Sequence, residues 1–102
     1  MSDALDRWLD HRRALAGASE NTIAAYRRDL LSFLAFMARH HGTAQGLAPI
    51  ARVTVSDMRA WMAHERGRGI AARSLARAIS AVKGFYRWLA EREGFEPTAV
   101  LS

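Results

Sequence analysis

The sequence predicts an all-α fold, a bundle of four helices in one domain of 102 residues. Apolar residues recur every three or four positions in four separate segments, which is the spacing of helices that each bury one face. A glycine follows each segment, where it can end a helix, and no stretch alternates apolar and polar residues as a half-buried strand does. The four segments span about residues 3–16, 20–41, 55–66 and 72–93.

The first two helices are predicted from their apolar faces and from the residues at their ends. Gly17 ends the first helix, whose buried face is predicted to hold Leu5, Trp8, Leu9 and Ala16. Ser19 is placed to cap the second helix, because its hydroxyl can accept a hydrogen bond from an unpaired amide of the first turn. The buried face of this helix is predicted to consist of Ile23, Tyr26, Leu30, Leu34 and Met37.

A loop over residues 42–53, which contains Gly42, Gly46 and Pro49, leads to the third helix. Thr54 and Asp57 have the spacing of a capping box, in which each side chain accepts a hydrogen bond from the backbone of the other residue. This helix is predicted to bury Met58, Trp61 and Met62.

The fourth helix follows Gly67 and Gly69. It begins without a side-chain cap, because Ala71 has no acceptor atom, and Gly94 ends it. Its predicted buried face holds Leu75, Ile79, Val82, Tyr86 and Leu89, with Ala78 and Phe85 at the flank.

The opposite face of the fourth helix is basic. Between positions 66 and 90 the chain has six basic residues and no acidic residue. A cationic face without counter-charges is shaped to lie against a polyanion, and duplex DNA is the polyanion that we expect. The face covers an arc of about 120° and consists of Arg73, Arg77, Ser80, Lys83 and Arg87, around the bare backbone of Gly84.

A second polar surface lies on the second helix, opposite its apolar face. Both surfaces can also be ordinary solvated faces, although solvated helix faces usually mix charges of both signs. A third interpretation is a protein-interaction module with no nucleic-acid ligand, in which Phe36 and Trp88 are exposed anchors; alternatively, both rings pack against neighbouring helices. The second surface consists of Asn21, Ala25, Arg28, Ser32 and Arg39.

Arginine dominates the charge of the chain. Lys and Arg total 15 against 10 Asp and Glu, so the net charge is +5, and 14 of the 15 cations are arginine. The guanidinium group matches phosphate oxygens and the guanine edge with two donors at once. No apolar run reaches the roughly 18 residues of a membrane span, and the acidic N-terminus is unlike a signal peptide. We therefore expect a cytoplasmic protein without a membrane partner.

Catalytic and cofactor sites are not indicated. The chain has no cysteine, and the adjacent His40 and His41 point about 100° apart, so they cannot hold one metal ion as an i,i+4 pair does. Tyr26 and Tyr86 lie within apolar faces and are predicted to be core residues. We expect no catalytic residue, no metal and no cofactor.

Three motifs resemble tyrosine recombinases of the Xer and phage-integrase type. Residues 19–30, SENTIAAYRRDL, resemble the family pattern S-x-N-T-x-x-x-Y-x-x-D-L. Residues 73–89, RSLARAISAVKGFYRWL, resemble the family's helix R-S-x-x-R-x-x-S-A-x-x-x-F-Y-x-[WY]-L. Between these two motifs, Val53-Thr54 and Asp57 resemble the family pattern v-T-x-x-D at the start of a helix. The chain departs from the family at Ala71, where Ser or Thr is usual, and in Glu96-Pro97-Thr98, where Asn-Pro-Ala is usual.

This resemblance implies a four-helix, SAM-like orthogonal bundle that serves as the core-binding domain, over residues 1–96, with residues 97–102 starting a linker. A C-terminal catalytic domain of the same chain would then close with it around a recombination half-site of double-stranded DNA, in chromosome dimer resolution or integration. The implied partners also include other recombinase protomers in a synaptic complex, while the present domain alone is expected to be monomeric and not to cut DNA.

The resemblance also implies which residues face DNA. Most of them are expected to contact phosphates, whereas Arg77 or Lys83, in the middle of the fourth helix, is expected to read a base. Arg27 lies nearer the buried face and is expected to pair with an acid instead. The expected contacts are Asn21, Thr22 and Arg28 on the second helix and Arg73, Ser74, Arg77, Ser80, Lys83 and Arg87 on the fourth.

Overall fold

All regular elements in the described part of the chain are α-helices, which confirms the all-α prediction. The computed structural model describes residues 2–15, 17–41 and 53–101, with only the backbone of Ser2 and His41. Most of the predicted loop 42–53 and the predicted core residue Ala16 lie outside the described residues. In chain order the helices are α1 (Ser2–Leu15), α2 (Glu20–His41), α4 (Val55–Gly67), α5 (Ala72–Glu93) and α6 (Thr98–Leu101).

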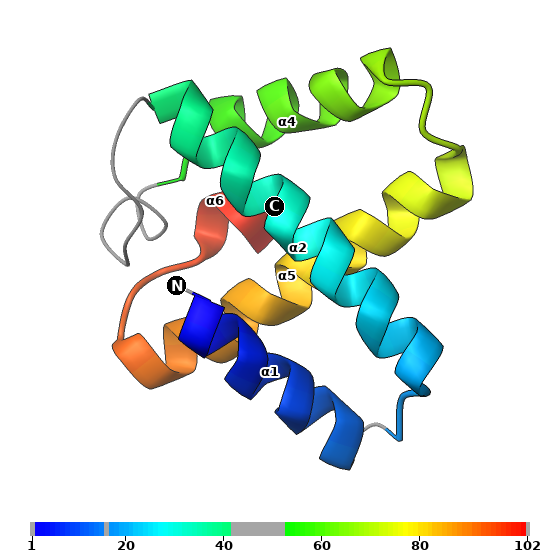
Figure 1. Ribbon diagram of the computed structural model, residues 1–102. Helices are drawn as coiled ribbons and strands as arrows, with labels where there is room; N and C mark the ends of the chain where they lie inside the picture. Colours follow the sequence, from blue (N-terminus) through cyan, green and yellow to red (C-terminus); the bar gives the residue numbers. More distant parts are fainter. Residues whose placement is uncertain (1, 16, 42–52, 102) are drawn as a thin grey trace.

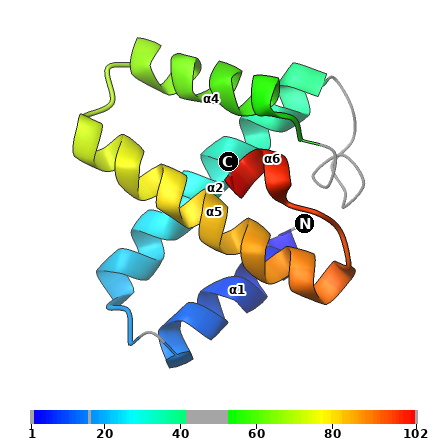
Figure 2. The same ribbon diagram turned by 180° about the vertical axis from the view of Figure 1, so that it is seen from behind.

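The two longest helices, α2 and α5, cross at the centre of the molecule and have the most extensive contact of any pair (Figure 1). Helix α1 packs on both of them, and α4 lies on the other side of the crossing (Figure 2). The short helix α6 packs on α4 and α5, with Val100 buried. This helix was not predicted. It lies within residues 97–102, which were expected to begin a linker, and it packs against the bundle instead.

Aromatic rings fill the core where α2, α4 and α5 meet. Phe33 of α2 is fully buried, with its ring centroid 5.1 Å from that of Trp61 and 5.9 Å from that of Tyr86, both at right angles to it. Phe33 was absent from the predicted stripe, and the predicted Tyr26, Met62 and Ile79 are only half-buried. The central helices touch neighbours on two sides, so their buried surface is wider than one stripe.

The predicted helix ends agree with the structure. The Ser19 hydroxyl accepts a hydrogen bond from the Thr22 amide at 3.2 Å. Thr54 and Asp57 form the predicted capping box: the Thr54 hydroxyl accepts from the Asp57 amide at 3.1 Å, and the Asp57 carboxylate accepts from the Thr54 amide at 2.9 Å. Ala71 provides no side-chain cap, and Gly94 ends α5 in the left-handed conformation, with φ 74°.

Replacing Thr54 by alanine should lower the free energy of unfolding by about 1 kcal/mol, because it removes the acceptor for the Asp57 amide. The matched control is Ser56→Ala, an exposed serine in the first turn of the same helix, which should leave stability nearly unchanged. Urea denaturation followed by circular dichroism measures both variants. Equal losses in the two variants would contradict the capping role.

Gly84 lies against α1 and not on an open surface. A Cβ atom at this position would be 3.2 Å from Cζ2 of Trp8, so α5 meets the indole ring of α1 here. The expectation that Gly84 offers bare backbone on the open cationic face is therefore wrong. Glycine allows the close packing of Trp8 against α5, and a helix pattern alone does not show which neighbour will lie over this position.

Candidate nucleic-acid interface

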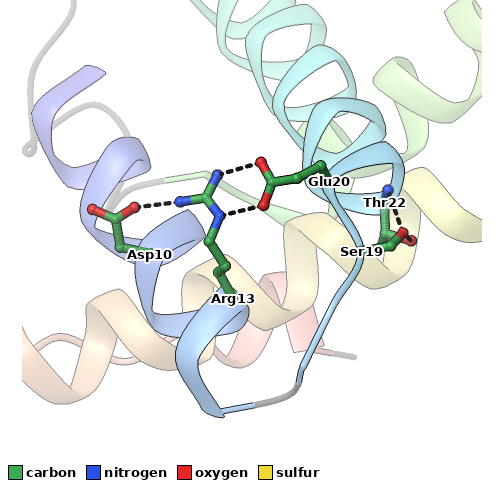
Figure 3. A network of polar contacts seen from close by, with 5 residues as sticks. All are labelled: Asp10, Arg13, Ser19, Glu20 and Thr22. Carbon is green, nitrogen blue, oxygen red and sulfur yellow. Dashed lines mark hydrogen bonds and ion pairs between the residues drawn. The ribbon is translucent and has the colours of Figure 1, made fainter.

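Acidic side chains pair with two of the three arginines of α1. Arg13 donates hydrogen bonds to Asp10 at 2.7 Å and to Glu20 at 2.7 and 3.2 Å (Figure 3). Arg7 pairs with Asp3 at 3.1 Å. Arg12, the third arginine of this helix, has no acidic partner within the described ranges, and its guanidinium lies over the rings of Trp8 and Tyr26, 5.9 Å from each centroid.

Arg27 pairs with Asp6 of α1 at 2.7 Å, as the sequence predicted. The pair connects α2 to α1 and removes Arg27 from the candidate interface. Both side chains are about half exposed, so this ion pair contributes little to stability.

The outer face of α5 has a different charge balance. Arg73 and Arg87 are exposed, Lys83 is half-buried, and none of the three has an acidic partner within the described ranges. Ser80 is exposed between them. Four of the five residues of the predicted basic arc therefore present cationic or hydroxyl groups with no counter-charge.

Arg77 is the exception in this arc, and the prediction that the arc lacks acidic partners is wrong there. Its Nε and Nη2 atoms donate to Oδ2 and Oδ1 of Asp29 at 2.8 and 2.9 Å, and Asp29 is only 8% exposed. These hydrogen bonds raise the pKa of Arg77 above its ordinary value. Since Asp29 lies 48 positions earlier, on α2, no local charge pattern could show the pair.

A polar cavity of about 280 Å³ lies where α2, α4 and the start of α5 meet. It brings together three of the predicted interface residues, Arg28, Ser74 and Arg77. Three charged residues of the cavity wall, Asp29, Glu65 and Arg68, were not predicted as site residues, although the i,i+3 spacing of Glu65 and Arg68 is a recognisable signal. Its lining consists of Arg28, Asp29, Ser32, Trp61, Glu65, Arg68, Ile70, Ser74, Arg77 and Ala78.

Glu65 is the most deeply buried carboxylate in the described part of the chain, at 2% exposure. It accepts a hydrogen bond from Arg68 at 2.6 Å and another from the Ser32 hydroxyl at 3.1 Å. Both of its oxygens are therefore engaged. The contact joins α2 to α4 and holds Arg68 at the wall of the cavity.

The remaining predicted contacts are distributed over several surfaces. Lys83 lies beside α4 and α6, in a mostly apolar groove with Met58 and Met62, and Arg87 lies beside α1, near Trp8. Asn21 is exposed on the first turn of α2. The Thr22 hydroxyl lies 3.0 Å from that of Ser19, within the helix cap. Base reading by Arg77 or Lys83 stays a prediction.

Phe36 and Trp88 are packed rather than exposed. The ring of Phe36 stacks on His40 at 5.3 Å and lies 5.1 Å from His64. Trp88 stacks on Phe85, with centroids 6.3 Å apart, and both rings pack against the core cluster. The interpretation as an interaction module with two exposed aromatic anchors loses its basis.

The described residues contain no group of three or more potential metal ligands. His40 instead pairs with Asp57 at 3.2 Å. Tyr86 is buried as predicted, and its burial raises the pKa of the phenol. No helix in the described ranges is long and apolar enough to cross a membrane.

These features define an all-helical domain in which two arginines of α1 are held in ion pairs and three cations of α5, Arg73, Lys83 and Arg87, have no acidic partner within the described ranges. The chain belongs to the family described as the phage integrase N-terminal SAM-like domain, which matches residues 5–93. This confirms the resemblance stated from the three sequence motifs.

Several curated relatives are named tyrosine recombinase XerC. The protein from Rhodospirillum centenum is 42% identical over 88 residues, which are 86% of this chain and 25% of the relative. Those from Methylobacterium nodulans and Bradyrhizobium diazoefficiens are each 39% identical over all 102 residues, covering 31% and 32% of their length. The chain thus spans about a quarter to a third of these relatives. No solved structure matches it significantly.

Proposed function

We propose that this domain binds duplex DNA through α2 and α5 as the N-terminal part of a site-specific tyrosine recombinase. The observation that carries the proposal is the uneven balance of charge. The arginines Arg7, Arg13 and Arg27 have acidic partners. Three cations of α5, Arg73, Lys83 and Arg87, have none within the described ranges, whereas Arg77 pairs with Asp29. An unpaired cationic helix face can neutralise DNA phosphates and so release the counterions condensed on the DNA.

The whole protein would then be a DNA-cleaving and rejoining enzyme, with its catalytic residues outside this domain. Its partners would be double-stranded DNA, a C-terminal catalytic domain of the same chain and other recombinase protomers in a synapse. We expect it to act in the cytoplasm, where the chromosome lies. The proposal is supported by the family match and by relatives named tyrosine recombinase XerC.

Binding to a duplex oligonucleotide should weaken steeply as salt is added. With about three to five phosphate contacts, the logarithm of the association constant should fall against the logarithm of salt concentration with a slope near −3 to −4. Fluorescence anisotropy measured at several salt concentrations gives this slope. No binding of duplex DNA at low salt would refute the proposal.

Two arginine variants make this test specific to the α5 face. Arg73→Gln should reduce the slope by about 0.9, because one counterion fewer is released. Arg7→Gln is the matched control: Arg7 is also exposed but pairs with Asp3, so its loss should leave the slope unchanged. Equal effects of the two changes would show that the net charge matters and the α5 face does not.

A further inference from the structure

A groove between α4, α5 and α6 leaves apolar side chains partly open to solvent. Its volume is about 370 Å³, and its wall contains Met58 and Met62 of α4 and Ile79 of α5. Val55, the first residue of α4, lines it and is 41% exposed, while Met62 and Ile79 are half-buried. Open apolar patches on a folded domain mark surfaces that another segment covers, and flexible methionine side chains adapt to such a segment.

The charges in the wall of this groove have one sign. Arg59 of α4 and Lys83 of α5 line it, and its described lining contains no acidic residue. Arg59 is exposed and has no acidic partner within the described ranges. A carboxylate brought to the edge of an apolar surface beside such a cation is partly shielded from water, so the attraction between them is stronger than in bulk solvent. The occupant that fits this groove is therefore an apolar protein segment with an acidic side chain.

Helix α6 brings the chain to this groove, since it lies between α4 and α5 (Figure 2). Ala99 and Val100 of α6 form part of the wall, and Val100 is only 3% exposed. The amides of Val100 and Leu101 both donate to the Pro97 carbonyl at 3.0 Å, which fixes the turn that carries them. The chain that follows Leu101 therefore starts beside the groove. A segment tethered so close has a high effective concentration there and needs few contacts to dock.

The relatives supply the other half of the argument, which is the length of chain that follows this domain. The chain spans about a quarter to a third of the relatives named tyrosine recombinase XerC. The family that matches it is described as an N-terminal domain. In a protein of that length and order, most of the residues follow α6.

We propose that this groove docks a segment of the same protein that follows residue 102, with apolar side chains against Met62 and Ile79 and an acidic side chain beside Arg59. The inference rests on the proposed function, because it requires the longer chain of a recombinase. The docked segment fixes the direction in which the chain leaves this domain. The groove is thus a protein contact, separate from the exposed cations Arg73 and Arg87 that are proposed to face DNA.

The first experiment compares methyl NMR spectra of the 102-residue chain and of the whole protein, both labelled with ¹³C at the methionine methyl groups. The Met62 resonance should shift between the two, because the docked segment covers this side chain. Met37, buried in the core and outside the groove lining, is the internal control and should not shift. An unshifted Met62 resonance in the whole protein would overturn the proposal.

A second copy of the chain is the other occupant that this experiment detects. Docking within one molecule predicts a Met62 shift that does not depend on protein concentration. A shift that appears in the 102-residue chain only as its concentration rises, together with dimers in sedimentation velocity, would make the groove an interface between copies. Docking of a segment from the same molecule would then be wrong.

Val55→Glu and Ser56→Glu form a matched pair in the first turn of α4. Both place the same charge at neighbouring exposed positions, but only Val55 lines the groove. Val55→Glu should abolish the difference in the Met62 resonance between the whole protein and the 102-residue chain with the same substitution, because a carboxylate breaks the apolar edge and repels the acidic side chain of the segment. Ser56→Glu should preserve this difference. Equal effects of the two changes would contradict docking in the groove.

Charge reversal at Arg59 tests the acidic side chain of the docked segment. Arg59→Glu should also abolish the Met62 difference, whereas Arg66→Glu, at an exposed arginine of the same helix outside the groove lining, should preserve it. If the 102-residue chain binds duplex DNA but the Met62 difference is absent or survives Val55→Glu, the docking proposal is wrong and the proposed function stands. If the chain does not bind duplex DNA, the proposed function fails, even where the Met62 resonance shows docking.

Discussion

Replacing Phe33 by alanine should lower the free energy of unfolding by about 3–5 kcal/mol. Phe33 is fully buried in the middle of α2, and its ring contacts Trp61 of α4 and Tyr86 of α5 edge to face. Its loss leaves a cavity at the point where three helices meet, and the long helices cannot collapse to fill it. Denaturation in urea, followed by circular dichroism, measures the change.

Phe36→Ala is the matched control for this variant. Phe36 lies one turn further along α2 but is only half-buried, and it contacts the rings of His40 and His64 nearer the surface. We expect less than half of the loss seen for Phe33→Ala. Equal losses would mean that the centre of the core lies closer to the α2–α4 contact than to the α2–α5 crossing.

A pair of glutamate substitutions on α5 should separate folding from DNA binding. Gly84→Glu places a side chain against the indole ring of Trp8, where even a Cβ atom is tightly placed, so it should cost about 1–3 kcal/mol of stability or more. Ser80→Glu, one turn earlier and exposed, should leave stability nearly unchanged. It should instead weaken DNA binding about 10-fold, because it puts a negative charge among Arg73, Lys83 and Arg87.

Thermal melts and anisotropy titrations on the same samples distinguish the two effects. The reverse result, a stable Gly84→Glu protein that has lost DNA binding, would show that Gly84 lies on an open surface that faces DNA. A Ser80→Glu protein that binds as tightly as the unmodified chain would exclude the α5 face from the interface.

Helix positions and ends could be predicted well because their signals are local. The bounds of α5 follow from the Gly67–Gly69 break and from Gly94, and the capping box of α4 follows from the spacing of Thr54 and Asp57. The fully buried Phe33 and Ala81 were missed from the predicted faces. Their burial depends on which helices cross over them, and a single-helix pattern has no information on that.

The candidate interface was predictable by residue type but not by arrangement. The cationic character of α5 followed from counting charges, and Arg73 and Arg87 are indeed exposed and unpaired within the described ranges. The position of Gly84 against Trp8 and the pairing of Arg77 with Asp29 both depend on tertiary contacts between distant segments. Short helix α6 was missed because four residues carry too little periodicity.

The two-pronged contact between Arg77 and Asp29 joins α5 to α2 at their crossing. A planar guanidinium paired side-on with a carboxylate tolerates little twisting, so the contact limits how far one helix can roll over the other. The surfaces on the two helices therefore keep one relative orientation in the free protein. A ligand that spans both helices would find them already aligned and would lose little entropy in ordering them.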